Sequence, residues 1–267
     1  MANLDSSFDH DTKAAAPALP RIRTITAMDL RDALRLGWED FMAQPSHLAF
    51  VALIYPVIGV LLAQLTVTYN IFPLLFPLLG GFALLGPFAA IGLYEISRRR
   101  ERGLDSGWEH AFALLRSPAI RQIMLLGAML TGLFIAWLFS AWLIYRGLLG
   151  LPADVSTADF LRAVFTTFNG WIMIVVGNSV GLLFAILAFS ISVVSFPHII
   201  DRRVDVATAV RTSIAAVEHN PRVMTIWGLM VTGLLVLGCL PLLVGLVVVM
   251  PVLGHATWHL YRKVVDG

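Results

Sequence analysis

The sequence predicts an all-α integral membrane protein with six transmembrane helices, arranged as three helical hairpins that are each preceded by a cytoplasmic amphipathic helix. Composition is the first reason, because 58% of the 267 residues are hydrophobic and only 13% are charged. A soluble domain has about 45–50% apolar and about 25% charged residues. Long charge-free runs and a one-sided distribution of Lys and Arg are the second and third reasons.

Charge-free runs mark the spans, since a helix needs about 20 apolar residues to cross roughly 30 Å of hydrocarbon. The last run, Val223–Tyr261, has 39 residues without Asp, Glu, Lys or Arg. As one helix it would be about 58 Å long, and Pro241 near its middle disfavours a continuous helix. We therefore divide it, which gives the predicted spans Leu48–Tyr69, Ile71–Tyr94, Ile123–Tyr145, Ile172–Ile200, Val223–Leu240 and Leu242–Tyr261.

The basic residues predict the orientation, because Lys and Arg near span ends favour the cytoplasmic side. With six spans and a cytoplasmic N-terminus, 17 of the 19 basic residues fall on the cytoplasmic side and only Arg146 and Arg162 fall outside. Both chain ends are then cytoplasmic. The single cysteine, Cys239, excludes an internal disulfide and every paired-cysteine motif.

The chain divides into a disordered cytoplasmic tail, 1–25, and a single transmembrane domain, 26–267. Within the domain we expect three repeat units, about 26–102, 103–203 and 204–267, each an amphipathic helix followed by a hairpin and then Arg. The first and third helices, Asp29–Pro45 and Asp205–Pro221, both end at proline, and the middle one, Leu104–Leu115, is less regular. The three would form a cytoplasmic collar that either lies in lipid or packs on the bundle.

The collar helices carry matching apolar positions at i, i+4, i+8 and i+11, which share one helical face. These positions are Leu30, Leu34, Trp38 and Phe41 in the first helix, and Val206, Val210, Ile214 and Val217 in the third. In the long outer loop, Ser156 and Asp159 have the spacing of a capping box and predict a further amphipathic helix at the outer interface.

Three histidines are weak candidates for binding a cofactor: His198, His255 and His259. His255 and His259 are four residues apart and share one helical face, as haem or metal ligands could. We favour instead an interfacial belt of these histidines with Trp258 and Tyr261. We predict no metal site and no cofactor, and keep haem or metal as the alternative.

Polar and small residues within the spans are candidates for helix packing or a solute pathway. Gly177, Asn178, Ser179 and Gly181 have GxxxG spacing, which lets another helix approach closely while the polar side chains bond across. The basic cluster Arg98, Arg99, Arg100 and Arg102 marks the cytoplasmic side, or binds lipid phosphate. Glu95, three residues earlier, is expected to pair with this cluster.

The sequence predicts no catalytic residue, since it contains no P-loop, no GxGxxG and no HExxH. A coupled carrier would need a carboxylate within the membrane, and no span contains one deep inside. We therefore expect a non-enzymatic accessory, assembly or scaffold component of a membrane complex that binds lipid and other membrane proteins but no nucleic acid. A transporter or channel for a small or lipid-like solute, and a haem- or metal-binding membrane protein, are the alternatives.

Three segments resemble an uncharacterised bacterial multi-pass inner-membrane family, a domain of unknown function whose members are sometimes labelled putative cytochrome c oxidase subunit I. They are GWEDF (Gly37–Phe41), SFPHIIDRRVD (Ser195–Asp205) and AVRTSIAAVEHNP (Ala209–Pro221). The resemblance implies the inner membrane of a bacterium and no assigned activity. The oxidase label does not fit a chain with half the spans of that enzyme, and implies at most an association with a respiratory complex.

Overall fold

The computed structural model describes residues 19–43, 64, 75–78, 86, 90–107, 110, 114–151, 155–240 and 244–266, and this part of the chain is helical. Its helices are α1 (Ala27–Ala43), α5 (Ile91–Glu101), the 3-10 turn η2 (Leu114–Arg116), α7 (Ile120–Leu148), α8 (Thr157–Thr166), α9 (Phe168–Ser192), α10 (Ser195–Arg202), α11 (Val206–His219), α12 (Pro221–Cys239) and α13 (Leu246–Val264). Within these residues the β structure is one isolated antiparallel bridge, between Ile22 and Val265.

Three helical segments of the described chain are long and apolar enough to cross a bilayer: Ile120–Leu148, Phe168–Arg202 and Pro221–Cys239. They contain the third predicted span and the fourth, and nearly all of the fifth. The first two predicted spans, Leu48–Tyr69 and Ile71–Tyr94, lie outside the described residues except for positions 64, 75–78, 86 and 90–94.

The predicted division at Pro241 is confirmed, because α12 ends at Cys239 and α13 begins at Leu246. Near this division the backbones of Gly238 and Gly245 touch, and a Cβ on Gly245 would lie 2.8 Å from the Gly238 Cα. α13 takes the place of the sixth predicted span, but its second half is buried against other helices of the same chain.

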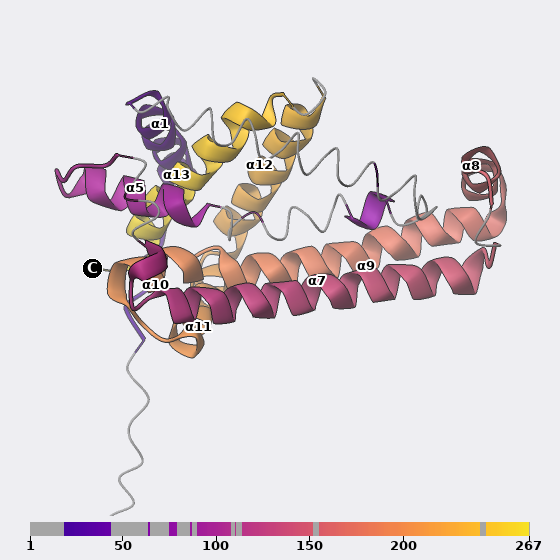
Figure 1. Cartoon of the computed structure of the whole chain (residues 1–267), viewed down its shortest axis with the longest axis horizontal. Helices are drawn as coiled ribbons and strands as arrows, with labels where there is room; N and C mark the ends of the chain where they lie inside the picture. The colour runs from indigo at the N-terminus through magenta and orange to yellow at the C-terminus, as the bar shows by residue number, and fades with distance from the viewer. Residues whose placement is uncertain are drawn as a thin grey trace, which may run out of the picture.

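Two hairpins meet at one end of the molecule and diverge from there (Figure 1). α7 and α9 run side by side as one hairpin, with α8 at its far end, while α12 and α13 form the other. The helices α1, α5, α10 and α11 gather where the hairpins meet. We call these four helices, together with the second half of α13, the junction.

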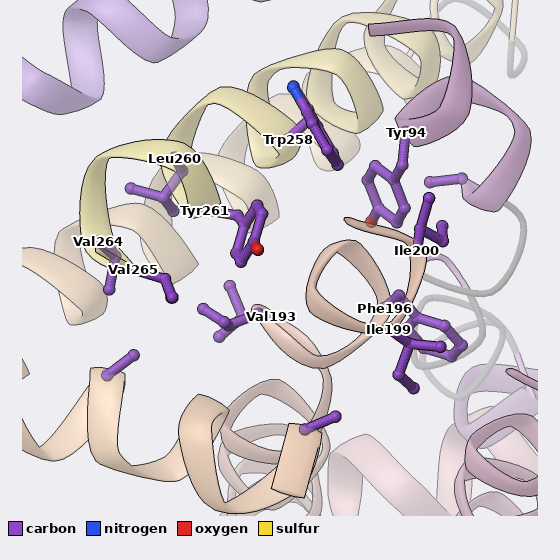
Figure 2. Close-up of a cluster of buried hydrophobic side chains, with 14 of the residues drawn as sticks. Tyr94, Val193, Phe196, Ile199, Ile200, Trp258, Leu260, Tyr261, Val264 and Val265 are labelled. Atoms are coloured by element: carbon purple, nitrogen blue, oxygen red, sulfur yellow. The ribbon is translucent and has the colours of Figure 1, made fainter. Parts of the chain in front are cut away.

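A hydrophobic core fills the junction (Figure 2). Trp258 and Tyr261 of α13 pack beside Tyr94 of α5, and Phe196 and Ile199 of α10 are fully buried. Because these side chains come from three helices far apart in sequence, the core joins the middle of the chain to its C-terminus.

The predicted interfacial belt is therefore wrong for α13. His255 and Trp258 have no exposed surface and Tyr261 is 1% exposed, so these side chains face the junction core and not the membrane surface. The side chains that were expected to lie at the membrane surface pack against other helices of the same chain.

Two of the predicted collar helices, α1 and α11, pack on the bundle. Small residues make these contacts. α1 buries Ala33 and Gly37 against α13, where a Cβ on Gly37 would lie 2.6 Å from the backbone nitrogen of Ala256. The predicted face is only partly buried, because Leu30 and Phe41 are covered while Trp38 is 48% exposed. Small side chains let helix backbones approach closely, and this displaces the buried face of α1 from the large apolar residues.

α11 shows the same effect more clearly. Its fully buried positions are small or hydroxylated: Thr208, Ala209, Thr212, Ser213 and Ala216. The predicted apolar residues Val206, Val210, Ile214 and Val217 are only partly buried. α11 thus contacts α9 and α10 through its small face.

The remaining predicted elements have mixed outcomes. The outer-loop helix is confirmed as α8, where the Ser156 hydroxyl accepts a hydrogen bond from the Asp159 backbone at 3.1 Å. Of the predicted middle helix, Leu104–Gly107 are not helical, Leu114–Arg116 form a 3-10 turn, and most of the rest lies outside the described residues.

The N-terminal segment is ordered further back than expected. The backbone of Arg23 donates to Val264 at 2.8 Å, and Asn220 accepts from the backbone of Ile25 at 2.9 Å. Residues 21–25 were predicted as disordered tail, and instead they tie the first helix to the C-terminus and to α11.

Candidate functional site

Two buried carboxylates, Asp40 of α1 and Asp201 of α10, organise the polar contacts of the junction. Asp40 is 6% exposed, and the side chain of Asp201 is 4% exposed. A buried charge is costly unless it is paired and hydrogen-bonded, and both carboxylates are. The contacts of each one explain why the histidines and arginines of the candidate sets lie where they do.

Asp40 joins α1 to α5 and α13. It accepts hydrogen bonds from Ser97 at 2.6 Å and from His259 at 2.8 Å, and it pairs with Arg100 at 3.0 Å. Since the single hydroxyl proton of Ser97 goes to Asp40, His255 donates its Nδ1–H to the Ser97 oxygen at 2.7 Å. The result is a relay of hydrogen bonds across three helices.

Burial raises the pKa of the Asp40 carboxyl, but the hydrogen bonds from His259 and Ser97 outweigh this effect and hold its pKa below the ordinary value. Asp40 is therefore ionised at neutral pH, and its negative charge is balanced by Arg100.

Asp201 joins α10 to α5 and α13. It accepts from the Tyr261 hydroxyl at 2.9 Å and pairs with Arg102 at 2.8 Å and with Arg262 at 3.5 Å. Arg202, next along α10, adds an ion pair at 3.3 Å. One carboxylate is thus surrounded by three guanidinium groups and a phenol from three helices.

Glu101 adds a third link between α5 and α13, since it accepts from the Trp258 indole at 3.1 Å and from Arg262 at 3.0 Å. The expected pairing of Glu95 with the basic cluster is confirmed, with two hydrogen bonds from Arg98 at 2.7 Å each. This pairing raises the pKa of Arg98.

The four arginines of the basic cluster each have a partner in the same chain. Arg98 binds Glu95, Arg100 binds Asp40, and Arg102 binds Asp201, while Arg99 donates to the backbone oxygen of Asp105. The sequence pattern indicates a topology signal or a phosphate site. In the structure Arg100 and Arg102 connect α5 to α1 and α10, while Arg98 and Arg99 bond within α5 and the turn that follows it.

The three candidate histidines also contact partners within the chain. His255 and His259 share a face of α13 as expected, and that face is turned toward Asp40. His198 of α10 contacts the Tyr261 hydroxyl through Nδ1 at 3.3 Å. A haem iron bound to Nε2 of His259 would displace the hydrogen bond to Asp40, so this set does not fit a haem without rearrangement. Within the described parts of the chain, no group of three or more His, Cys, Asp and Glu side chains is placed to hold a metal ion.

The small-residue segment of α9 is brought against α7 at one position. A Cβ on Gly181 would lie 3.0 Å from the Trp137 ring, whereas one on Gly177 would meet nothing within 4 Å. Asn178 and Ser179 are exposed and donate to carbonyl oxygens one turn earlier in α9, at 2.7 and 2.8 Å. The polar side chains therefore bond within their own helix.

The five residues Gly177–Gly181 also match the G-x-S-x-G pattern of serine hydrolases. That motif acts when the serine stands on a sharp strand-to-helix turn beside a histidine. Here Ser179 lies within the continuous helix α9, and its hydroxyl is bonded to the carbonyl oxygen of Val175. The segment lacks the geometry of a nucleophile.

Asp40 and Asp201 were not predicted as site residues, although both stand in quoted segments, GWEDF and SFPHIIDRRVD. One signal was available for Asp40, since it lies three residues after Gly37 on the face that α1 buries. Nothing local in the sequence distinguishes Asp201 from an ordinary exposed carboxylate at a helix end.

The central segment of the chain matches a known protein family. Residues 75–201, slightly less than half of the chain, match the model of DUF2189, described as a predicted integral membrane protein. The chain matches an uncharacterised family of integral membrane proteins. The matched segment includes α5, α7, α9 and α10, and so it contains the basic cluster and Asp201 but not Asp40. The family description mentions no oxidase, and no curated protein or solved structure matches the chain.

Proposed function

We propose that the protein is an accessory, assembly or scaffold component of a membrane complex in the bacterial inner membrane, with no catalytic centre of its own. In this proposal six spans form three hairpins, both termini are cytoplasmic, and the junction is the cytoplasmic side of the protein. The carrying observation is that two buried carboxylates of the junction, Asp40 and Asp201, are both used to hold helices together.

Catalysis at the junction would require buried ion pairs to be broken. Breaking a buried ion pair by removing one partner costs about 3–5 kcal/mol. General acid–base chemistry needs a group that can reach a substrate and exchange a proton with it. Ser97 and His255 have no exposed surface, and any substrate that reached Asp40 would have to displace its partners. The junction is built to be rigid, which suits a protein that acts by presenting a surface.

Asn178 supports a partner in the membrane. It is ten residues into α9 and lies within the candidate span Phe168–Arg202, so we place it inside the hydrocarbon layer. Its side chain is exposed. A polar side chain facing lipid is costly, whereas one facing another helix can bond across the interface. We therefore assign the Asn178 side of α9 to a helix of a partner membrane protein.

The test is purification in mild detergent from the native membrane, with every co-eluting protein identified and a visible spectrum recorded. The proposal expects a colourless protein with a stoichiometric partner that is lost on Asn178→Leu. Thr232→Leu is the matched control, because Thr232 is exposed on α12 and also bonds within its own helix, and it should keep the partner.

Two outcomes would contradict the proposal. A colourless protein that purifies alone and passes a solute in proteoliposomes would make it a transporter. A Soret band that disappears in His255→Ala would make it a haem protein, since haem absorbs there and the accessory role needs no chromophore.

A further inference from the structure

A cavity of about 470 Å³ lies where α10 turns into α11, beside both ends of the described chain. Its volume is in the range of small-molecule sites, about 300–1,000 Å³. Charged groups of both signs line it: Arg202 and Arg203 on the basic side, and Asp205 and Asp266 on the acidic side, with His198 also in the wall. None of these lining residues takes part in the hydrogen bonds or ion pairs of Asp40.

His198 supplies a hydrogen-bond acceptor that the protein does not satisfy. The Tyr261 hydroxyl donates its proton to Asp201 at 2.9 Å, so its oxygen receives the Nδ1–H of His198 at 3.3 Å. In a neutral imidazole the other nitrogen, Nε2, then carries a lone pair. His198 is 3% exposed, and this Nε2 has no hydrogen-bond partner in the described structure. A buried acceptor without a partner is rare in folded proteins, so this Nε2 calls for a donor from outside the chain.

Arg203 supplies positive charge from a strained position. Its backbone is left-handed, with φ 55° and ψ 35°, a conformation uncommon for residues other than glycine. This residue is the C-cap of α10, and its backbone N–H donates to the Ile199 carbonyl oxygen at 2.9 Å. Arg203 forms no ion pair with the described residues, and Arg202 pairs with Asp201 through Nε at 3.3 Å.

The two carboxylates keep capacity to bind a cation. Asp205 caps α11 by accepting from the Thr208 backbone at 3.0 Å and from its hydroxyl at 2.7 Å. Asp266 pairs with Arg23. A carboxylate has about four lone-pair positions, so each can still accept from an ammonium group.

We propose that this cavity binds a zwitterionic aminoalkyl phosphate, with the phosphate at Arg202 and Arg203 and the ammonium at His198 Nε2 and the carboxylates. The cavity begins at the end of the candidate span Phe168–Arg202, the depth at which lipid headgroups lie. A phosphatidylethanolamine headgroup and free phosphoethanolamine share this chemistry, and the experiment distinguishes the two sources.

The test is native mass spectrometry of the delipidated full-length protein in detergent, titrated separately with phosphatidylethanolamine, phosphatidylglycerol, phosphatidylcholine and phosphoethanolamine. We expect phosphatidylethanolamine to be retained at least several-fold better than phosphatidylglycerol, which has no amine, and phosphatidylcholine, whose ammonium has no N–H to donate to His198. Retention of free phosphoethanolamine alone would identify a soluble ligand with the same chemistry.

Arg203→Gly separates binding from folding, because glycine adopts the left-handed backbone without strain. It should lower retention roughly tenfold, the effect of losing one charged hydrogen bond, and leave the melting temperature unchanged or higher. Arg211→Ala, an exposed arginine outside the cavity wall, is the control and should bind like wild type. Equal retention of the three lipids, or equal behaviour of the two variants, would overturn the proposal.

Discussion

Substitution of Gly37 tests how α1 is held. In the structure an added Cβ would lie 2.6 Å from the backbone nitrogen of Ala256 and 2.8 Å from its Cα. Non-bonded carbon contacts are favourable near 3.5–4.0 Å, so α1 would have to move away from α13 by about 1 Å. Asp40 is one turn further along α1, and its 2.8 Å hydrogen bond to His259 would lengthen beyond hydrogen-bond range.

The magnitude follows from three contributions. Overpacking costs about 1–3 kcal/mol, and loss of a hydrogen bond to a charged group costs about 1.5–3 kcal/mol. Replacing glycine by alanine inside a helix returns about 1 kcal/mol. We therefore expect Gly37→Ala to lower the free energy of unfolding by about 1.5–5 kcal/mol, with most of the loss at the α1–α13 contact.

The measurement is an SDS titration in mild detergent, followed by tryptophan fluorescence, with limited proteolysis of α1 as a second readout. Gly132→Ala is the matched control, because Gly132 lies in α7 and its added Cβ would meet nothing within 4 Å. The control should be neutral or slightly stabilising. If the two variants unfold alike and α1 stays protected in both, the close crossing of α1 and α13 does not hold the junction.

Asp40→Asn should destabilise the protein by about 2–3 kcal/mol, because it leaves buried donors without a charged acceptor. Glu39→Gln, at a side chain that is 48% exposed, should change the free energy of unfolding by less than about 0.5 kcal/mol. Equal SDS midpoints for the two variants would contradict the role of Asp40. The pKa of Asp40 is lowered on folding from 3.8, so its contribution is fully present above about pH 4 and is lost as the pH falls through the folded pKa. An acid titration should therefore show a fall in stability below pH 4 that is smaller in Asp40→Asn, and superimposable acid limbs would refute this assignment. Gly170→Ala should disrupt the turn between α8 and α9, since its Cβ would overlap a backbone carbonyl oxygen of α8; proteolysis in this turn should increase, whereas Gly177→Ala, with open space around it, should be cut like wild type.

The sequence predicted the helices better than their buried faces. Runs of apolar residues between charges determined α7, α9 and α12, because lipid requires a length and a composition that few other structures need. The buried faces of α1 and α11 were misplaced, since large apolar residues suggested one face and small residues made the contact. Periodicity measures apolar character, whereas close helix crossings depend on the absence of a side chain, as at Gly37.

The candidate site shows a related limit. The spacing of His255 and His259 correctly placed both on one face of α13. What that face meets depends on Asp40, more than 200 residues away in the chain. The same holds for Arg102 and Asp201. Long-range pairing of this kind leaves no periodic signal in a single sequence. The arginines of the basic cluster were therefore interpreted as a surface feature.

Cysteine labelling tests the proposed arrangement most directly, because the chain has a single native cysteine and it is exposed at the end of α12. If the junction is cytoplasmic, Cys239 lies at the opposite surface, and a membrane-impermeant thiol reagent should label it in intact spheroplasts. In a Cys239→Ser background, Arg35→Cys on the exposed side of α1 should be labelled only after the membrane is permeabilised. Labelling of both positions from the same side would contradict the account.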